Sequence, residues 1–160
     1  PKLSFNHPCT ELFWFVTATG GTSPVDNLNW YNFTTNQAGT TPTTVNANVV
    51  ARSATASVNP IASAKLVLNG NDRFSERNGS YFNTIQPYQH HENVPTNAGI
   101  NVYSFALKPE EHQPSGTCNF SRIDNAELIT TAGSATYNVY AVNYNVLRIM
   151  SGMGGLAYSN

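Results

Sequence analysis

The apolar positions of this chain fall into short runs of the kind that form β-strands. The strongest run is LFWFV, residues 12–16, within TELFWFVTA, residues 10–18, which ends just before Gly20-Gly21. Aromatic and β-branched residues favour extended backbone, and a continuous apolar run indicates a strand with both faces covered. We therefore predict a strand over residues 10–18 that is buried on both faces. The run is far shorter than the ~20 residues of a membrane-spanning helix, so no transmembrane segment is predicted.

A second strand, followed by a tight turn, is predicted at residues 64–72. Ala64, Leu66 and Leu68 alternate along AKLVLNG, so they share one face of an extended segment. The turn formers Asn69-Gly70-Asn71-Asp72 come directly after it. An Asn-Gly pair flanked by alternating apolar residues is a strong signal for a hairpin turn.

The middle of the chain predicts one short helix and two further strands. SERNGSYFNTIQPYQHH, residues 75–91, is interrupted by turn-forming residues and leaves room for at most one short helix around residues 80–85. GINVYSFALKP, residues 99–109, predicts a strand with apolar groups on both faces that its final proline stops. NAELITT, residues 125–131, predicts a short extended segment.

The segment TYNVYAVNYNVLRIM, residues 136–150, fits the spacing of a helix and of a strand equally well. Val139, Val142, Val146 and Ile149 recur at helical intervals, yet apolar residues also alternate along the segment. Composition favours a strand, because Val, Ile, Tyr and Asn are poor helix formers. We predict one last strand here.

At least five strands with little helix and long loops predict an all-β fold, an antiparallel sandwich or jelly roll. The 160 residues fit a single domain, with no internal repeat. Residues 17–63 form a long polar excursion, in which NWYNF, residues 29–33, and VNANVV, residues 45–50, are possible short strands. The chain begins at Pro1 without an initiator methionine, so we expect a processed chain or a piece of a longer one.

Charge argues against a polyanionic partner. Eight basic and nine acidic residues give a formal net charge of −1, which provides no field to attract nucleic acid. Charged residues make up 11% of the chain, against about 25% in typical soluble domains. Abundant neutral polar residues suit a β-rich protein whose surface is covered by neighbouring subunits.

Three histidines and a carboxylate, His90, His91, Glu92 and His112, invite a metal-site interpretation of the cupin type. Adjacent side chains on a strand point to opposite faces, so two ligands from one strand require the spacing His-x-His. The sequence has His-His instead, and we expect neither a metal nor another cofactor.

The segment PEEHQPSGTCNFSRID, residues 109–124, carries the functional groups of a hydrolase without their usual context. Ser115, Ser121 and Cys118 are candidate nucleophiles, but no Gly-x-Ser-x-Gly elbow surrounds them. Glu110 and Glu111 are consecutive, so their carboxylates diverge and do not make the pair that a glycosidase uses. We expect no catalytic residue and no enzymatic activity.

The alternative for residues 109–124 is a turn that leads into a strand. Phe120 and Ile123 are then the inward-facing anchors. We expect the carboxylates of the turn to cap backbone N–H groups or to meet nearby arginines, namely Arg73, Arg77 or Arg122.

Neither the two cysteines nor the glycine-rich end is expected to form a catalytic or ligand-binding site. Cys9 and Cys118 are too few for a disulfide framework or a metal set, and we expect both to be reduced and structural. SGMGG, residues 151–155, lacks the Lys-Ser/Thr ending of a phosphate-binding loop. We expect it to be a flexible tail that docks elsewhere.

Three sequons, at Asn32, Asn78 and Asn119, are candidate glycosylation sites. Asn32 is the most plausible of them, because it lies in the polar excursion. The aromatic segment Asn29–Phe33, with Trp30 at its centre, is a candidate sugar-binding surface.

Four long segments together resemble one family, the major capsid proteins of the large nucleocytoplasmic DNA viruses of eukaryotes. They are FNHPCTELFWFV, AKLVLNGNDRFSERNGSYFNTIQPYQHH, GINVYSFALKPEEHQPSGTCNFSRIDNAEL and VYAVNYNVLRIMSGMGGLAYSN. They occur in family order and cover most of the chain. Only the excursion at about residues 17–63 matches nothing.

The resemblance implies a structural protein of the virion. Members carry two successive jelly rolls, and three subunits form a pseudo-hexagonal capsomer that tiles an icosahedral shell around an internal membrane. This chain resembles the carboxy-terminal jelly roll without its first strand or strands. The resemblance also implies minor capsid proteins as partners, assembly in the cytoplasm of the infected cell and an outward loop at residues 17–63, where a host glycan or receptor would be met.

Two other functions stay open from the sequence. One is a carbohydrate-binding jelly-roll module that docks sugar on Trp30, and the other is a cupin-like metalloprotein built on His90, His91 and His112.

Overall fold

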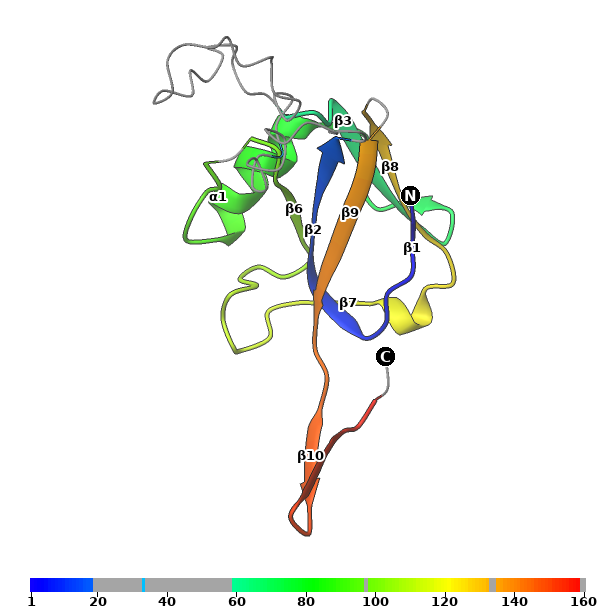
Figure 1. The fold of residues 1–160 in the computed structure, drawn as a ribbon, viewed down its shortest axis with the longest axis vertical. Coiled ribbons are helices and arrows are strands. Elements are labelled where there is room, and N and C mark those ends of the chain that lie inside the picture. The colour runs from blue at the N-terminus through cyan, green and yellow to red at the C-terminus, as the bar shows by residue number, and fades with distance from the viewer. Residues whose placement is uncertain (19–32, 34–58, 97, 133–134, 159–160) are drawn as a thin grey trace, which may run out of the picture.

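The computed structural model describes residues 1–18, 33, 59–96, 98–132 and 135–158, and within them two antiparallel sheets face each other (Figure 1). A separate two-stranded hairpin extends from one end. The strands are β1 (Lys2–Leu3), β2 (Pro8–Ala18), β3 (Ser63–Leu68), β4 (Asn71–Asp72), β5 (Arg77–Asn78), β6 (Asn101–Ser104), β7 (Cys118–Asn119), β8 (Ala126–Thr131), β9 (Ala135–Asn143), β10 (Leu147–Met150) and β11 (Met153–Leu156).

Strand β2 is the centre of the first sheet. It pairs with β9 along nearly its whole length, and on its other edge with β6 and β7. The strand predicted over residues 10–18 is thus confirmed. Its burial is uneven, because Leu12, Trp14 and Val16 are fully buried while Phe13 and Phe15 on the opposite face are only half-buried.

The second sheet has the order β1-β8-β3-β4, with β5 also pairing with β3. The predicted strand at residues 64–70 is confirmed as β3, and the predicted extended segment at residues 125–131 as β8. Asn69 and Gly70 form the predicted turn, with φ angles of 50° and 80°. This left-handed backbone is the reason an Asn-Gly pair suits the position.

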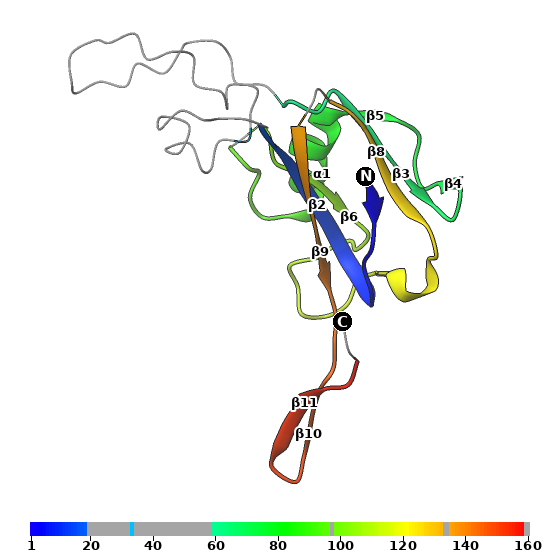
Figure 2. The same ribbon diagram turned by 45° about the vertical axis from the view of Figure 1, so that its right-hand side comes forward.

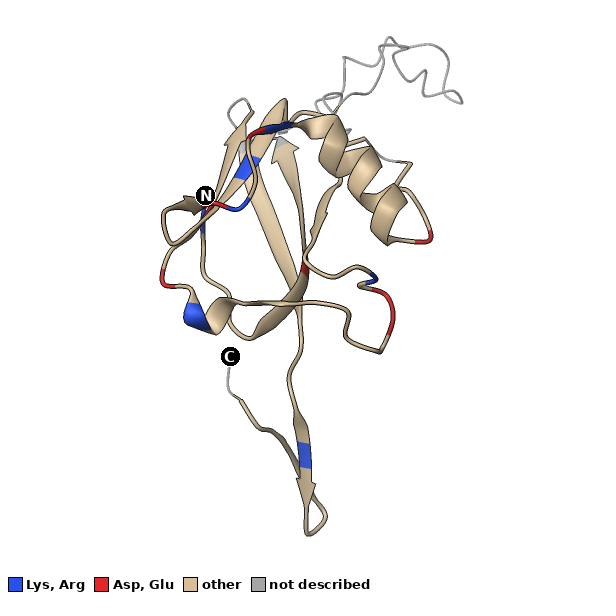
Figure 3. Cartoon of the chain, turned by 180° about the vertical axis from the view of Figure 1, so that it is seen from behind, with Lys and Arg blue, Asp and Glu red and all other residues tan. Residues whose placement is uncertain are grey.

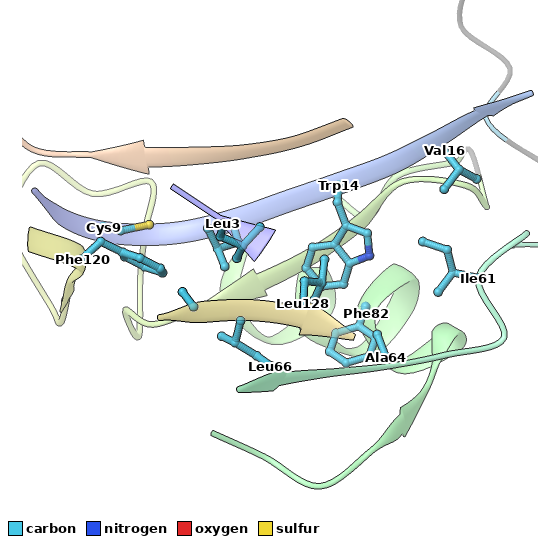
Figure 4. Close-up of a cluster of buried hydrophobic side chains, with 12 residues drawn as sticks. Leu3, Cys9, Trp14, Val16, Ile61, Ala64, Leu66, Phe82, Phe120 and Leu128 are labelled. Carbon is cyan, nitrogen blue, oxygen red and sulfur yellow. The ribbon is translucent and has the colours of Figure 1, made fainter. Parts of the chain in front are cut away.

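The core lies between the two sheets (Figure 4). Trp14 from β2 contacts Phe82, with the ring centroids 5.2 Å apart. Leu66 of β3 and Leu128 of β8, paired in register across the second sheet, are both 1% exposed. The inward faces of both sheets therefore share one apolar layer.

The helical segment beside β6 is longer than predicted. A π-helical turn at Tyr81–Ile85 continues into α1 (Gln86–His90), so the expected helix at residues 80–85 extends to His90. Pro87 does not end the helix; it stands at the junction where the π-helical turn passes into α1. No helix among the described residues is long and apolar enough to cross a membrane.

Buried hydrogen bonds attach this helix to β6. The side chain of Gln86 accepts from the backbone N–H of Ser104 at 3.2 Å and donates to the hydroxyl of Tyr81 at 2.7 Å. Asn83 donates to the carbonyl of Ile100 at 2.9 Å. The helix therefore lies along the free edge of β6, and its Phe82 reaches into the core between the sheets.

Two predicted strands are shorter than expected. The segment 99–109 forms a strand only at β6, because the Thr10 carbonyl then accepts the N–H groups of both Phe105 and Ala106 and the ladder stops. The segment 136–150 is broken after β9, where Tyr144 donates to the carbonyl of Pro8, the first residue of β2. Since β2 begins there, β9 has no further partner on it and the chain leaves the sheet.

The glycine-rich end forms a strand rather than the expected flexible tail. β10 and β11 pair from Leu147–Leu156 to Met150–Met153, and Ser151 and Gly152 make the turn with φ angles of 52° and 80°. Figure 2 shows this hairpin extending away from both sheets. A phosphate-binding loop needs a strand-to-helix context, which this hairpin does not provide.

Two adjacent residues of β8 can test which face of the strand points into the core. Leu128→Ala should lower the free energy of unfolding by about 2–5 kcal/mol because it leaves a cavity in the core. Ile129→Ala, at a side chain that is 45% exposed, should cost less than about 1 kcal/mol, because surface changes have small effects. Urea denaturation measures both. Equal losses would show that the register of β8 is wrong.

Candidate functional site

The histidines proposed as metal ligands do not converge. His90 is the last residue of α1, and its Nδ1 lies 2.9 Å from the carbonyl oxygen of Leu107. His91 follows in extended conformation, and His112 is exposed in the loop after β6. Within the described ranges no group of three His, Cys, Asp or Glu side chains is arranged so that it could hold a metal ion. These residues offer nothing to build a cupin-like centre.

His91 instead lies between two carboxylates. Its Nδ1 is 2.9 Å from Oε1 of Glu110, and its Nε2 is 3.1 Å from Oε2 of Glu11. The second contact is close in distance but is not aligned as a hydrogen bond, and neither of its atoms has another partner among the described residues. We call the three residues the histidine latch. It joins the centre of β2, the end of α1 and the loop after β6.

Burial and the neighbouring His91 shift the pKa of Glu11 in opposite directions. Desolvation raises the pKa of Glu11, and the neighbouring His91 offsets part of that rise. Glu110 is exposed, and its pKa is lowered, first by the hydrogen bond from His91 and then by the backbone N–H of Glu92. An ionised carboxylate only accepts hydrogen bonds. Wherever a ring nitrogen of His91 faces a carboxyl group, a proton must therefore be present on one of the two groups.

The loop between β6 and β7 is held by the latch and by its own turns. Glu92 donates its N–H to Glu110 at 3.3 Å, which confirms the prediction of a capping carboxylate. The prediction that these carboxylates meet arginines is wrong, because Glu110 pairs with His91 and Glu111 pairs with Lys108.

The end of the same segment forms the predicted turn into a strand. β7 follows the loop, and a 3₁₀ turn at Phe120–Arg122 comes after it. Phe120 is 2% exposed and Ile123 contacts the core cluster, so both predicted anchors are confirmed.

The candidate nucleophiles are all engaged in structural contacts. Ser115 Oγ accepts from the N–H of Lys108 and donates to its carbonyl, which closes the loop. Ser121 Oγ accepts from the N–H of His7 at 2.8 Å. Hydroxyls held in this way are not paired with a catalytic base.

Cys9 and Cys118 are free thiols at directly opposed positions of β2 and β7. Burial raises the pKa of the Cys9 thiol to about 12, the reverse of the shift that activates a nucleophilic cysteine. Burial likewise raises the pKa of Cys118. Both behave as small apolar side chains of the sheet.

Two of the three sequons lie among the described residues, at the surface of the protein. Asn78 and Asn119 are exposed, and each uses its Oδ1 to accept the backbone N–H two residues ahead, from Ser80 and Ser121 respectively. Asn32 and Trp30 lie outside the described residues.

The sequence did not predict a partly exposed apolar surface on the first sheet. On the outer face of the first sheet, Phe13 stacks on Tyr140 with ring centroids 5.2 Å apart, and Phe15 lies 5.8 Å from the same ring. Tyr140 and Val142 are 47% and 41% exposed. We call Phe13, Phe15, Tyr140 and Val142 the outer strip. The latch lies on the β6 side of this face. Phe33 packs on Phe15 with ring centroids 4.1 Å apart, and among the described residues Tyr140 and Val142 stay partly exposed.

The hairpin adds to this partly exposed surface. Six of its apolar side chains and neighbours are more than half exposed, namely Val146, Leu147, Ile149, Met150, Met153 and Leu156. The alternation of apolar residues in the segment 136–150 was a signal for this surface, but periodicity does not say which face lacks a cover.

The latch can be tested by neutralising each of two adjacent glutamates. Because the pKa of Glu110 is lowered in the folded protein, its stabilising contribution is present above the ordinary pKa of glutamate and is lost as the pH falls through the lowered value. Glu110→Gln should speed amide hydrogen exchange of Glu92 at neutral pH by up to about fivefold, since exposed pairs contribute under about 1 kcal/mol. Glu111→Gln, which affects only Lys108, should leave that amide unchanged. Equal effects would contradict the latch.

Known proteins with similar sequences are viral capsid proteins. The family model described as "Large eukaryotic DNA virus major capsid protein" matches residues 1–155. The major capsid protein of Phaeocystis pouchetii virus is 69% identical over 110 residues, covering 64% of this chain and 21% of that protein. That of Paramecium bursaria Chlorella virus 1 is 44% identical over 187 aligned residues, covering 99% of this chain and 43% of its own length. The chain therefore spans less than half the length of these relatives.

Solved structures agree with the sequence comparison. A quasi-atomic model of the capsid of Paramecium bursaria Chlorella virus 1 matches with a TM-score of 0.74 and 40% identity, over 100% of this chain and 45% of that one. The Faustovirus major capsid protein matches with a TM-score of 0.59 and 12% identity over 87% of this chain, a likeness of fold alone. The predicted antiparallel jelly roll is confirmed, and none of these proteins favours a carbohydrate-binding module or a metalloprotein. The chain belongs to the family of major capsid proteins of large eukaryotic DNA viruses.

Proposed function

We propose that this chain is a structural part of a virion, the carboxy-terminal jelly roll of a major capsid protein, with no enzymatic activity. The match of the family over residues 1–155 is the observation that carries the proposal. The fold supports it, because Ser115, Ser121 and Cys9 serve structural contacts and several apolar side chains among the described residues are exposed, which suits protein–protein contact. In this proposal residues 1–160 are one domain, and the excursion at about residues 17–63 is an outward loop.

The complete protein then forms homotrimers with pseudo-hexagonal outline, which build an icosahedral shell together with minor capsid proteins. Assembly takes place in the cytoplasm of the infected cell, next to an internal membrane that the chain itself does not enter. The near-neutral charge of the chain supports close packing of identical copies, because it limits their mutual repulsion.

A glycan is a secondary proposal. Asn78 and Asn119 are exposed, so a sugar attached to either would extend into solvent. A host glycan or receptor would be met on the outward loop.

The proposal predicts a trimer of the complete protein. Size-exclusion chromatography with light scattering at micromolar concentration should give three times the subunit mass, and electron microscopy should show shells once minor capsid proteins are added. A complete protein that stays monomeric at that concentration would contradict a role as capsid subunit.

A further inference from the structure

Two consecutive histidines hold the loop after β6, and they do so in different ways. His90 Nδ1 lies 2.9 Å from the carbonyl oxygen of Leu107. A carbonyl oxygen only accepts hydrogen bonds, so this ring nitrogen donates, and it does so in the neutral ring as well as in the charged one. His91 is different, because a carboxyl group faces each of its two ring nitrogens.

The contact with Glu110 takes one proton of His91. Glu110 is exposed, and the hydrogen bond from His91 is the main cause of its lowered pKa. Glu110 is therefore ionised at neutral pH and only accepts hydrogen bonds. Nδ1 of His91, which lies 2.9 Å from Oε1 of Glu110, carries the proton between them. In a neutral imidazole that proton is the only one, and Nε2 is then an acceptor.

The opposite ring nitrogen requires a second proton. Nε2 of His91 lies 3.1 Å from Oε2 of Glu11, and the two side chains are only 14% and 15% exposed. Neither atom has a hydrogen-bond partner in the described part of the chain. Two acceptors that face each other away from water cost free energy. One additional proton, on either His91 or Glu11, removes this cost.

The surroundings leave this proton to the pair. Besides burial, the groups that shift the pKa of Glu11 are His91 and Glu110. Figure 3 shows the basic and acidic positions of the loop after β6 side by side at the edge of the molecule. The other charged or titratable side chains of this region are exposed to solvent, namely Glu92, Lys108, Glu111 and His112. The strand residues paired with Glu11 are not titratable, namely Ser104 on β6 and Val142 on β9.

We propose that a proton shared by Glu11 and His91 fastens the loop after β6 to the first sheet, and that a rise in pH removes this proton and loosens the loop. Once the proton has left, Nε2 faces an ionised carboxylate and the two groups repel each other. The contact between His90 and Leu107 needs no additional proton and remains. The loosening is therefore a local change at the histidine latch.

The two glutamates set the limits of pH within which the latch is tight. Burial raises the pKa of Glu11, so its contribution to stability is present below the ordinary glutamate pKa and is lost as the pH rises through the raised value. The pKa of Glu110 is lowered, so its contribution is lost only as the pH falls through the lowered value. The latch is tightest between these two pKa values.

Hydrogen exchange of the loop measures the alkaline limit. Amide exchange of residues 105–117 in the complete protein is followed by mass spectrometry from about pH 5 to about pH 9, a range that contains the ordinary histidine pKa. Each rate is divided by the intrinsic exchange rate at the same pH. The corrected rate should be about tenfold higher at the alkaline end, because a charge-assisted contact is lost there. Residues 63–68 of β3 should stay slow throughout, since the change is local.

Glu11→Gln separates the shared proton from other effects of pH. The glutamine amide donates to Nε2 of the neutral ring, so the corrected exchange rate of the loop should stay low at the alkaline end. His90→Asn is the matched control on the neighbouring histidine. It should change the rate by the same factor at every pH and leave the alkaline rise in place.

Two results would overturn the proposal: an alkaline rise that persists unchanged in Glu11→Gln, or a corrected rate in the unmodified protein that does not depend on pH. If circular dichroism shows that Glu11→Gln does not fold, His91→Gln takes its place, because a side chain without a titratable ring should also abolish the rise. The latch joins parts of one chain, so these results are independent of the trimer that tests the capsid role.

Discussion

The pairing of β2 with β9 and β6 is the interaction on which the rest of this structure depends. β2 forms backbone ladders on both of its edges, and its alternate side chains face two different environments. Leu12, Trp14 and Val16 complete the core, while Glu11 and Phe13 form the outer face. A one-residue slip of β2 would exchange these two sets. The core, the histidine latch and the outer strip are therefore fixed by one register.

The outer face of that sheet is divided between two roles. On the β6 side the partly buried Glu11 is met by His91, which directly follows α1. On the β9 side the aromatic rings of Phe13, Phe15 and Tyr140 stack on one another and stay partly open to solvent. A buried carboxylate without a charge partner is energetically costly, whereas an exposed apolar side chain costs much less. The division follows from this difference in the cost of exposure.

Local sequence patterns predicted the elements more reliably than their ends. The strands at residues 10–18 and 125–131 and the Asn-Gly turn were predictable because alternation and turn chemistry act over a few residues. The ends of β6 and β9 were not, since they depend on where β2 begins and on which carbonyl accepts Phe105 and Ala106. These contacts join residues from the start of the chain to residues far along it. The extension of the helix past Pro87 depends on the position of that proline within a turn, which the sequence pattern did not reveal.

The candidate site was harder to predict, because the sequence pattern does not show which side chains meet and which stay exposed. His91 was visible as a titratable side chain, but its partners Glu11 and Glu110 come from distant segments, and only the fold brings them together. The apolar alternation of residues 136–150 predicted strands correctly and implied burial within the chain. An isolated soluble domain with such a sequence would cover these residues itself. Among the described residues, this segment is therefore the one that departs most from the usual relation between apolar sequence and burial.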